Sequence, residues 1–426
     1  MQYPLRRSER GAILIHVAVA ILVLIGFLTF VVDYGVMWVG RGQAQNAADS
    51  GALAGAVAMA FDVNGWTDRA PTGPAKTSAH QIARSNGVWG EAPAVDIQTD
   101  INFTNDPADM CPAGAGGLTP CIRVDVYRNQ AHGNPLPAVF GQAVGLTSQG
   151  VRATATARVA VADSSSCLKP WAIPDKWLDN YDEDPPIDGD WTDDDAFETV
   201  QPRGGKKGGG PFVPDVYIKP GRGTVGTGFT VAADRGRLVR LKQGGPSTSI
   251  SPGVFQPVRI PSLTCPDPSG ADCYRESIYK CNGLAISIGD TLQSENGDMI
   301  GPTKQGVEGG GSVPAGQALI EQDPDARWEN GGVVDSCATT MPPTCAMSPR
   351  VVAIPVFDTA AYDNFVLSGT PGLPTFEIVN ILGFFIDRMQ GNDVVGYLLE
   401  APGLSTTEDV PIDPESSFLR LIQLIR

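Results

Sequence analysis

The chain contains the segment QAQNAADSGALAGA at residues 43–56, shortly after the apolar run GAILIHVAVAILVLIGFLTFVV at residues 11–32. That run of 22 residues has no Asp, Glu, Lys or Arg. At about 1.5 Å per residue it can cross the roughly 30 Å hydrocarbon core of a bilayer. After the run, the first cluster of helix-ending residues is at 62–65 and the first proline is Pro71. The sequence therefore predicts one continuous helix from about residue 12 to residue 60.

Small residues recur at helical spacing in the second part of this helix. Ala44, Ala48, Gly51 and Gly55 lie on one face, and Gly51 and Gly55 form a small-x-x-x-small pair. Such a face lets another backbone approach closely. Two interpretations remain open. The face packs against a partner helix just outside the membrane or against the globular part of the same chain, and both can hold along different parts of the helix.

The flanks of the apolar run predict its orientation in a membrane. Residues 1–10 form a basic head with three arginines, which favours a cytoplasmic N-terminus. Tyr34 and Trp38 stand where an interfacial aromatic belt is expected. The run is longer than the roughly 7–15-residue core of a signal peptide, and no small-residue cleavage site closes it. We therefore expect an uncleaved single-pass anchor, with the bulk of the chain outside the cytoplasm.

His16 lies inside the apolar run. An ionisable residue at that depth is a functional candidate by default. The other interpretation is a neutral imidazole near the cytoplasmic end of the span, hydrogen-bonded to water or to a neighbouring helix.

The composition excludes some classes of function. The chain has 426 residues and a net charge of -16, with no basic stripe that could neutralise phosphates, so it is not expected to bind nucleic acid. Broad adhesion to anionic lipid is excluded for the same reason.

The length predicts two or three domains. The counts of 50 Gly and 35 Pro favour many turns and short strands.

Cysteine usage indicates an oxidising compartment. The chain has eight cysteines, and none forms a C-x-x-C motif. An even number of cysteines beyond a membrane span favours disulfides over metal binding. Cys111 and Cys121 flank one Gly/Pro-rich loop and are expected to pair with each other. The pairing of the other six is left open by the sequence.

A family resemblance is carried by residues 9–60, ERGAILIHVAVAILVLIGFLTFVVDYGVMWVGRGQAQNAADSGALAGAVAMA. This segment resembles the N-terminal domain of the TadE/TadG-like family of Flp (Tad) pilus-assembly proteins. The matching features are the basic head, the glycine that opens the span, VDYG at its exit and, most specifically, RGQAQNAADSGALAGA. The resemblance implies an inner-membrane-anchored minor component, or a pseudopilin-like part, of a bacterial tight-adherence pilus.

One position departs from the relatives that a prepilin-type peptidase cleaves. In those relatives a Glu stands five residues after the glycine, whereas here His16 stands five residues after Gly11. The resemblance to the TadG branch therefore implies an anchor that is not processed after Gly11.

Alternating patterns after the helix predict a small sheet. Residues 95–103, 121–128 and 151–162 alternate apolar and polar side chains, and residues 76–87 favour a short helix. A long helix packed on three antiparallel strands would form a pilin-like α+β module over residues 61–163.

The remaining chain divides by composition. Residues 164–226 are acidic and then Gly-rich, which predicts a linker. Residues 227–426 contain many short strand patterns separated by turn residues, which predicts a mainly-β, disulfide-stapled extracytoplasmic domain. The expected fold class is therefore α+β. Its parts are a transmembrane helix at 11–32 that continues to about 60, a small antiparallel sheet and a mainly-β domain.

Motifs for chemistry are weak. Asp188, Asp190 and Asp193 in DGDWTDDD could hold Ca²⁺, but the EF-hand register fails and a solvated acidic loop is the other interpretation. The match of GRGTVG at 221–226 to a dinucleotide fingerprint lacks the preceding strand and following helix, so a turn is expected. Only three histidines occur, and no hydrolase, zinc-protease or P-loop motif is present. We expect no catalytic site and no cofactor.

These observations give a primary hypothesis and two alternatives. The primary hypothesis is a bitopic membrane component of a Tad/Flp pilus assembly, a minor subunit or an assembly factor that acts by helix packing and anchoring. Its expected partners are the membrane and other pilus-assembly proteins or pilins, and self-association is also open. The first alternative is a membrane-tethered binding or adhesin module. The second is a tethered hydrolase with clustered carboxylates.

Overall fold

The computed structural model describes most of the chain, in ranges separated by short gaps. The described residues are 10–104, 111, 119–180, 191–192, 195–201, 212–244, 249–338, 345, 347–369, 371–405 and 410–425. The chain divides into two compact units. Unit 1 comprises residues 1–159 and 422–426, and unit 2 comprises residues 160–421.

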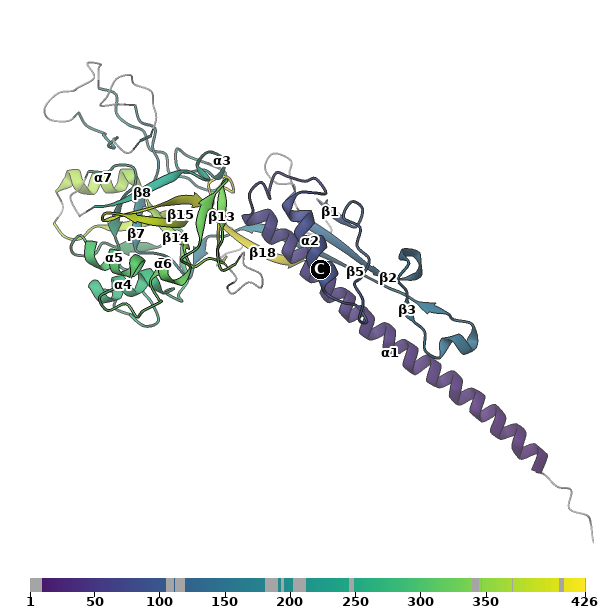
Figure 1. The fold of residues 1–426 in the computed structure, drawn as a ribbon. Helices are drawn as coiled ribbons and strands as arrows, with labels where there is room; N and C mark the ends of the chain where they lie inside the picture. The colour runs from purple at the N-terminus through teal and green to yellow at the C-terminus, as the bar shows by residue number, and fades with distance from the viewer. Residues whose placement is uncertain are drawn as a thin grey trace, which may run out of the picture. The chain divides into compact units, whose positions relative to one another are not determined.

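Unit 1 is built from two helices and an antiparallel sheet, with a small hairpin between two of its strands. Its elements are α1 (Arg10–Phe61), α2 (Pro74–Ser85), β1 (Ile101–Thr104), β2 (Cys121–Arg128), the 3₁₀ helix η3 (Gln130–His132), β3 (Leu136–Pro137), the 3₁₀ helix η4 (Gly141–Val144), β4 (Ser148–Gln149) and β5 (Val151–Val161), the last two residues of which belong to unit 2. The helix predicted for residues 12–60 is confirmed as the single helix α1, drawn in purple in Figure 1.

The sheet of unit 1 buries one face against α1 and α2. β1, β2 and β5 pair antiparallel, with Ile101 opposite Val124 and Val124 opposite Ala155. Because strand side chains alternate between faces, the odd-numbered residues from Val151 to Val159 share one face, and all of them are buried. These side chains and the alanines of the two helices form one hydrophobic core.

A strand from the far end of the sequence completes this core. Residues 422–425 of β18 (Leu419–Ile425) belong to unit 1, and Ile422 and Leu424 pack against its core. In the sheet order β18 is the neighbour of β5. The sequence predicts this stretch as part of the domain 227–426, because the alternation of LRLIQLI identifies a strand but not the sheet that it joins.

Unit 2 is β-rich and carries five helices within the described residues. Its elements are β6 (Ser164–Ser165), β7 (Trp171–Pro174), α3 (Val231–Asp234), β8 (Leu238–Gln243), β9 (Val254–Pro257), α4 (Ala271–Tyr279), β10 (Ile286–Ser287), β11 (Thr291–Gln293), α5 (Ile300–Glu308), α6 (Leu319–Gln322), β12 (Arg327–Glu329), β13 (Gly332–Val334), β14 (Val351–Phe357), α7 (Thr359–Ser368), β15 (Thr375–Gln390), β16 (Asp393–Leu399), β17 (Ala401–Pro402) and the first residues of β18.

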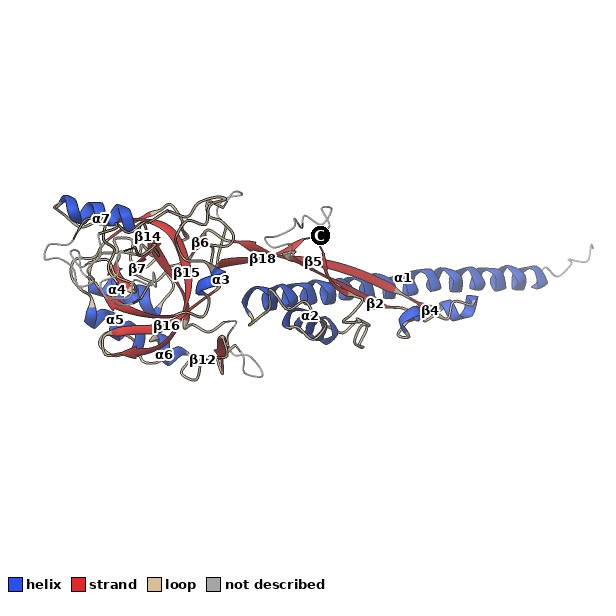
Figure 2. Ribbon diagram, turned by 90° about the horizontal axis from the view of Figure 1, so that it is seen from above, coloured by secondary structure: helices blue, strands red, loops and turns tan. Residues whose placement is uncertain are grey.

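Six of these strands close into a barrel. The order β15-β14-β7-β9-β8-β16 returns to β15 because β16 also pairs with β15. The β14–β7 and β8–β9 pairs are parallel, and the other four are antiparallel. Figure 2 labels β7, β14, β15 and β16 among the red strands of unit 2. Closure removes the free edges that an open sheet would expose.

Large side chains build the main hydrophobic core of unit 2. Trp171, Phe255, Ile354 and Phe384 are fully buried members of the main core of unit 2. Trp171 belongs to β7, which lies inside the stretch 164–226 that the composition identifies as a linker. Trp177, Trp191 and Phe197 from the same stretch also join this core, with ring centroids 5.4 Å apart between Trp177 and each of the other two. This stretch therefore contributes residues to the core of unit 2, although its acidic composition predicts a linker.

All eight cysteines are paired, as Cys111–Cys121, Cys167–Cys281, Cys265–Cys273 and Cys337–Cys345. The expected pairing of Cys111 with Cys121 is confirmed. The fold is mixed α+β, with a long apolar helix on a sheet, followed by a β-rich region with a barrel and disulfides. This confirms the predicted class, while the closure of the barrel was not predicted.

Candidate membrane anchor, its packing face and a buried polar cluster

The first part of α1 is an exposed apolar cylinder. From residue 13 to residue 31 every side chain that the structure describes is exposed, and none in its most apolar window is buried. Among the described residues α1 alone is long and apolar enough to cross a membrane. A helix that is apolar all round needs an apolar environment on all sides. The helix is therefore consistent with a membrane anchor and, together with the disulfides, suggests an extracytoplasmic location for the folded units.

The second part of α1 carries the small residues, and α2 covers them. Ala44 and Ala48 are fully buried. A Cβ atom added to Gly51 would lie 2.8 Å from Ala83 Cβ, and one added to Gly55 would lie 2.7 Å from Ile122 Cδ1. Only glycine permits approaches this close. Of the two open interpretations, the structure shows packing within the same unit.

Polar side chains at several positions along α1 form hydrogen bonds with the rest of unit 1. Gln45 donates from Nε2 to the Thr154 carbonyl oxygen at 3.1 Å, and Gln43 Oε1 accepts the Trp89 backbone N–H at 2.7 Å. Asp33 accepts three backbone N–H groups from residues 139–141. Sequence reasoning missed the role of Asp33. The available signal was its position as the first charged residue after the apolar run.

His16 lies on the exposed apolar part of α1. It is separated from Ala44 by 28 residues, or about 42 Å along the helix axis. The structure therefore does not bring His16 together with the Ala/Gly face, and the two are separate features of one helix. The weak metal candidates Asp188, Asp190 and Asp193 lie outside the described residues. Within the described part of the chain, no group of three or more His, Cys, Asp or Glu side chains could hold a metal ion.

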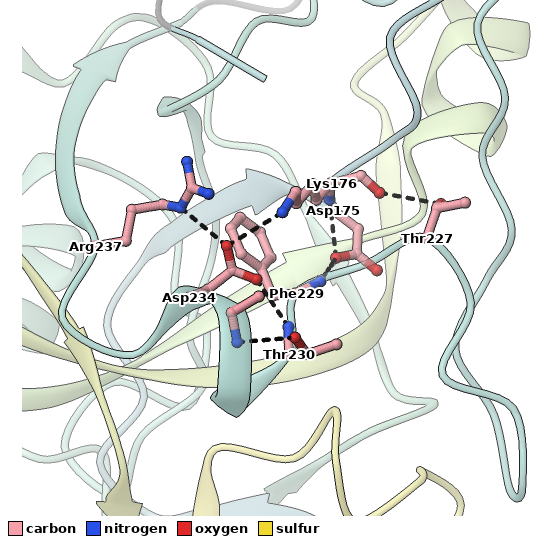
Figure 3. Close-up of polar contacts among 8 residues, drawn as sticks. Asp175, Lys176, Thr227, Phe229, Thr230, Asp234 and Arg237 are labelled. Atoms are coloured by element: carbon pink, nitrogen blue, oxygen red, sulfur yellow. Dashed lines mark hydrogen bonds and ion pairs between the residues drawn. The ribbon is translucent and has the colours of Figure 1, made fainter. Parts of the chain in front are cut away.

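A buried polar cluster lies where β7 leaves the barrel of unit 2 (Figure 3). Asp175 is fully buried, and its Oδ1 accepts the backbone N–H groups of Lys176 at 2.9 Å and Phe229 at 3.1 Å. Its Oδ2 accepts the Tyr217 hydroxyl at 3.2 Å. Burial raises the pKa of the Asp175 carboxyl to about 7, although these hydrogen bonds oppose the shift.

A second buried carboxylate stands beside it. Asp234 forms ion pairs with Lys176 Nζ at 3.3 Å and Arg237 Nε at 2.9 Å, and accepts the Thr230 backbone N–H at 2.9 Å (Figure 3). These contacts join α3 and the segment before it to the end of β7.

The segment GRGTVG at 221–226 precedes this cluster. Gly221 and Thr224 form an isolated antiparallel bridge, and Gly223 and Gly226 have positive φ of 71° and 70°. The segment is a tight turn and opens no helix directly, as the sequence analysis expects.

Unit 2 also contains a cavity of about 300 Å³ beside a buried lysine. Lys169 lines it and donates from Nζ to the Lys280 carbonyl oxygen at 2.9 Å and the Ser277 carbonyl oxygen at 3.3 Å. Burial lowers the pKa of the Lys169 ammonium to about 7. The disulfide-bonded Cys167 and the partly exposed Leu404 contribute to the wall.

Comparison with known proteins bears on α1. Residues 11–58 match a family model described as putative Flp pilus-assembly TadE/G-like. No curated protein and no solved structure matches the chain. The matched residues coincide with the exposed apolar part of α1 and the part that α2 covers, and the resemblance carried by the sequence motifs is confirmed. Over residues 11–58, the long N-terminal helix of this chain is thus similar to the TadE/G-like domain of Flp pilus-assembly proteins.

Proposed function

We propose that this chain is a bitopic, single-pass component of a Tad/Flp-type pilus assembly, as a minor pilus subunit or an assembly factor. Its N-terminus lies in the cytoplasm, and the chain after about residue 33 lies in the periplasm or beyond. One observation carries the proposal. The TadE/G-like segment coincides with a single helix that is exposed and apolar in its first part and packed into a folded unit in its second part.

The continuity of α1 defines the mechanism that we propose. Because one uninterrupted helix belongs to both the span and unit 1, an assembly that captures the span also orients unit 1. The Ala/Gly face already holds α2, so pilus proteins would contact the span itself. His16 then becomes a polar contact to a partner's span. Members of the family are typically non-enzymatic, and we propose no catalytic step.

The test is loss and restoration of surface filaments. Cells that lack the chain should yield few or no sheared filaments, and the full chain should restore them. A matched variant replaces residues 11–32 with an unrelated apolar span of equal length. We expect it to remain in the membrane but to restore filaments poorly.

Two outcomes would contradict the proposal. Normal filaments without the chain would exclude a role in assembly. Full restoration of filaments by the unrelated span would show that residues 11–32 only hold the chain in the membrane and make no specific contact with pilus proteins. Shearing of the wild type then distinguishes a subunit, found in filaments, from an assembly factor, retained in the membrane.

The cavity beside Lys169 favours a second candidate function, a membrane-tethered binding module. A cavity of about 300 Å³ is at the lower end of the sizes that accommodate small ligands. Under this hypothesis, Leu404→Trp at the cavity wall lowers adhesion of the cells to a surface but leaves filament number unchanged. Leu367→Trp, on the exposed side of α7, is the matched control. Equal adhesion of both variants and the wild type would exclude the cavity as the binding site.

A further inference from the structure

The hairpin loop of residues 133–150 in unit 1 has an unusual surface. It contains β3, η4 and β4 and has no Asp, Glu, Lys or Arg, in a chain of which 18% of residues are charged. Three of its large apolar side chains are exposed, Val139 at 52%, Phe140 at 38% and Leu146 at 59%. An uncharged loop that presents three apolar side chains indicates contact with an apolar partner.

The loop is attached to α1 where the apolar run ends. Asp33 directly follows that run and is buried. Its Oδ1 accepts the backbone N–H groups of Val139 at 2.8 Å and Phe140 at 3.3 Å, and its Oδ2 accepts that of Gly141 at 2.5 Å. These donors are available because η4 begins at Gly141, so the N–H groups at its start have no acceptor within the helix.

Two glycines bring the loop close to the helix. A Cβ atom at Gly141 would lie 2.9 Å from Asp33 Oδ2, and one at Gly40 would lie 2.8 Å from Leu136 Cδ1. Both views show the hairpin beside the middle of α1 (Figure 1 and Figure 2). The position of the loop along α1 is therefore set by contacts that the Asp33 side chain and Gly40 make with the loop.

These residues of α1 have the features of a membrane–water interface. Tyr34 and the 70%-exposed Trp38 extend a row of rings from Phe30, with centroids 5.7 Å and 6.4 Å apart. Tyr and Trp concentrate at that interface. The next charged residue of α1 after Asp33 is Arg41, about 12 Å further along the axis. A loop attached between residues 33 and 40 lies in the same layer.

We propose that the 133–150 loop is a second membrane contact, in which Val139, Phe140 and Leu146 insert into the interfacial layer of the extracytoplasmic leaflet beside the span. The inference rests on the membrane-anchoring part of the proposed function. Continuity with the apolar span favours lipid over protein as the occupant. The absence of charge makes the contact independent of anionic lipid, which a chain of net charge -16 would otherwise repel. Two contacts, the span and the loop, would fix the tilt of unit 1 over the membrane.

The experiment measures how deep single residues lie in lipid. Because all eight native cysteines are paired, an introduced cysteine is the one free thiol to label with an environment-sensitive fluorophore. The full chain carries Leu146→Cys, with Leu24→Cys in the span and the exposed Ile82→Cys on α2 as controls. It is reconstituted in vesicles of phosphatidylethanolamine and phosphatidylglycerol that contain lipids spin-labelled near the top and near the middle of the acyl chains, so that both depths are sampled.

Lipid quenching should be about fivefold stronger at Leu146 and Leu24 than at Ile82. Quenching at Leu24 but not at Leu146 would overturn the loop contact and leave the anchor intact. Absence of quenching at Leu24 would overturn the anchor itself. A fluorescence shift at Leu146 that grows with protein density, without lipid quenching, would indicate contact between copies and also overturn the proposal.

A second pair of variants tests the attachment. Asp33→Ala removes the acceptor of the three N–H groups and should lower quenching at Leu146 to the level of Ile82, while quenching at Leu24 is unchanged. Asp33→Asn keeps one acceptor oxygen and should restore most of the quenching at Leu146. Unchanged quenching at Leu146 in Asp33→Ala would show that Asp33 does not set the depth of the loop.

Discussion

At the scale of the residue, burial decides the role of each carboxylate. The chain has 47 Asp and Glu residues, and the sequence draws attention to Asp188, Asp190 and Asp193 because they are clustered. The structure instead singles out Asp175, which stands alone in AIPDKW and is fully buried. No local pattern predicts this burial, because it arises where β7 leaves a barrel assembled from distant strands.

Asp175 predicts a pH dependence of stability. Its pKa rises from 3.8 to about 7 on folding, first because of burial and also because of the nearby Asp358 carboxylate. The folded state therefore binds the proton more tightly than the unfolded state. This contribution to the free energy of unfolding is fully present below about pH 4 and is lost as the pH rises to about 7, by on the order of 2–4 kcal/mol.

The measurement compares Asp175→Asn with the wild type across this pH range by denaturant unfolding. The Asn variant keeps an oxygen for the N–H groups of Lys176 and Phe229, and its amide can face Tyr217. Its stability relative to the wild type should increase between about pH 4 and pH 7. Glu377→Gln, at an exposed carboxylate that pairs with Lys219 at the surface, is the control. If the difference in the free energy of unfolding between Asp175→Asn and the wild type did not change with pH, the raised pKa of Asp175 would be contradicted.

At the scale of the element, α1 combines two environments in one helix. Its first part is apolar on all sides, and its second part is apolar and small on the side that α2 covers. Length and composition were enough to predict the helix and both parts. They could not predict what covers the small face, because a partner helix and α2 need the same small residues. The run of Ala75, Ala79 and Ala83 in α2 was the available signal for the intramolecular solution.

Gly51 predicts a test of this packing. Gly51→Ala places a Cβ atom 2.8 Å from Ala83 Cβ and 3.0 Å from the Ala79 carbonyl oxygen, and should destabilise unit 1 by about 1–3 kcal/mol. Gly42→Ala is the matched control, since a Cβ atom there meets nothing within 4 Å. It should stabilise α1 by about 0.5–1 kcal/mol through helix propensity.

Thermal unfolding of both variants in the same detergent gives the comparison. If Gly51→Ala were as stable as Gly42→Ala, α2 would not lie against α1 at the observed distance. If Gly51→Ala nevertheless abolished filaments, the small face would have to pack against a helix of a partner protein.

At the scale of the whole molecule, unit 2 depends on contacts between distant parts of the chain. Its barrel joins strands from residues 171–174 to residues 393–399. Cys167 and Cys281 are 114 residues apart, whereas Cys265 and Cys273 are 8 apart. Closing a longer loop restricts the unfolded chain more.

The two disulfides should therefore differ in their effect on stability. Replacement of Cys167 and Cys281 by Ser should lower the free energy of unfolding by about 5 kcal/mol, and replacement of Cys265 and Cys273 by about 2.5 kcal/mol. Denaturant unfolding of the two double variants measures both. Equal losses, or a larger loss for the short loop, would show that loop length does not determine the contribution of these disulfides.

The sequence by itself determined the long apolar helix, the β-rich character of the rest, the family resemblance and one disulfide. These features follow from local periodicity, run length and short spacing, which neighbouring residues express directly. The tertiary structure alone decided that α2 covers the Ala/Gly face, that residues 422–425 join unit 1, that six strands close a barrel and that Asp175 is buried. Each of these depends on which distant segments meet, and alternating apolar side chains predict that a strand has a buried face without specifying the segment that covers it.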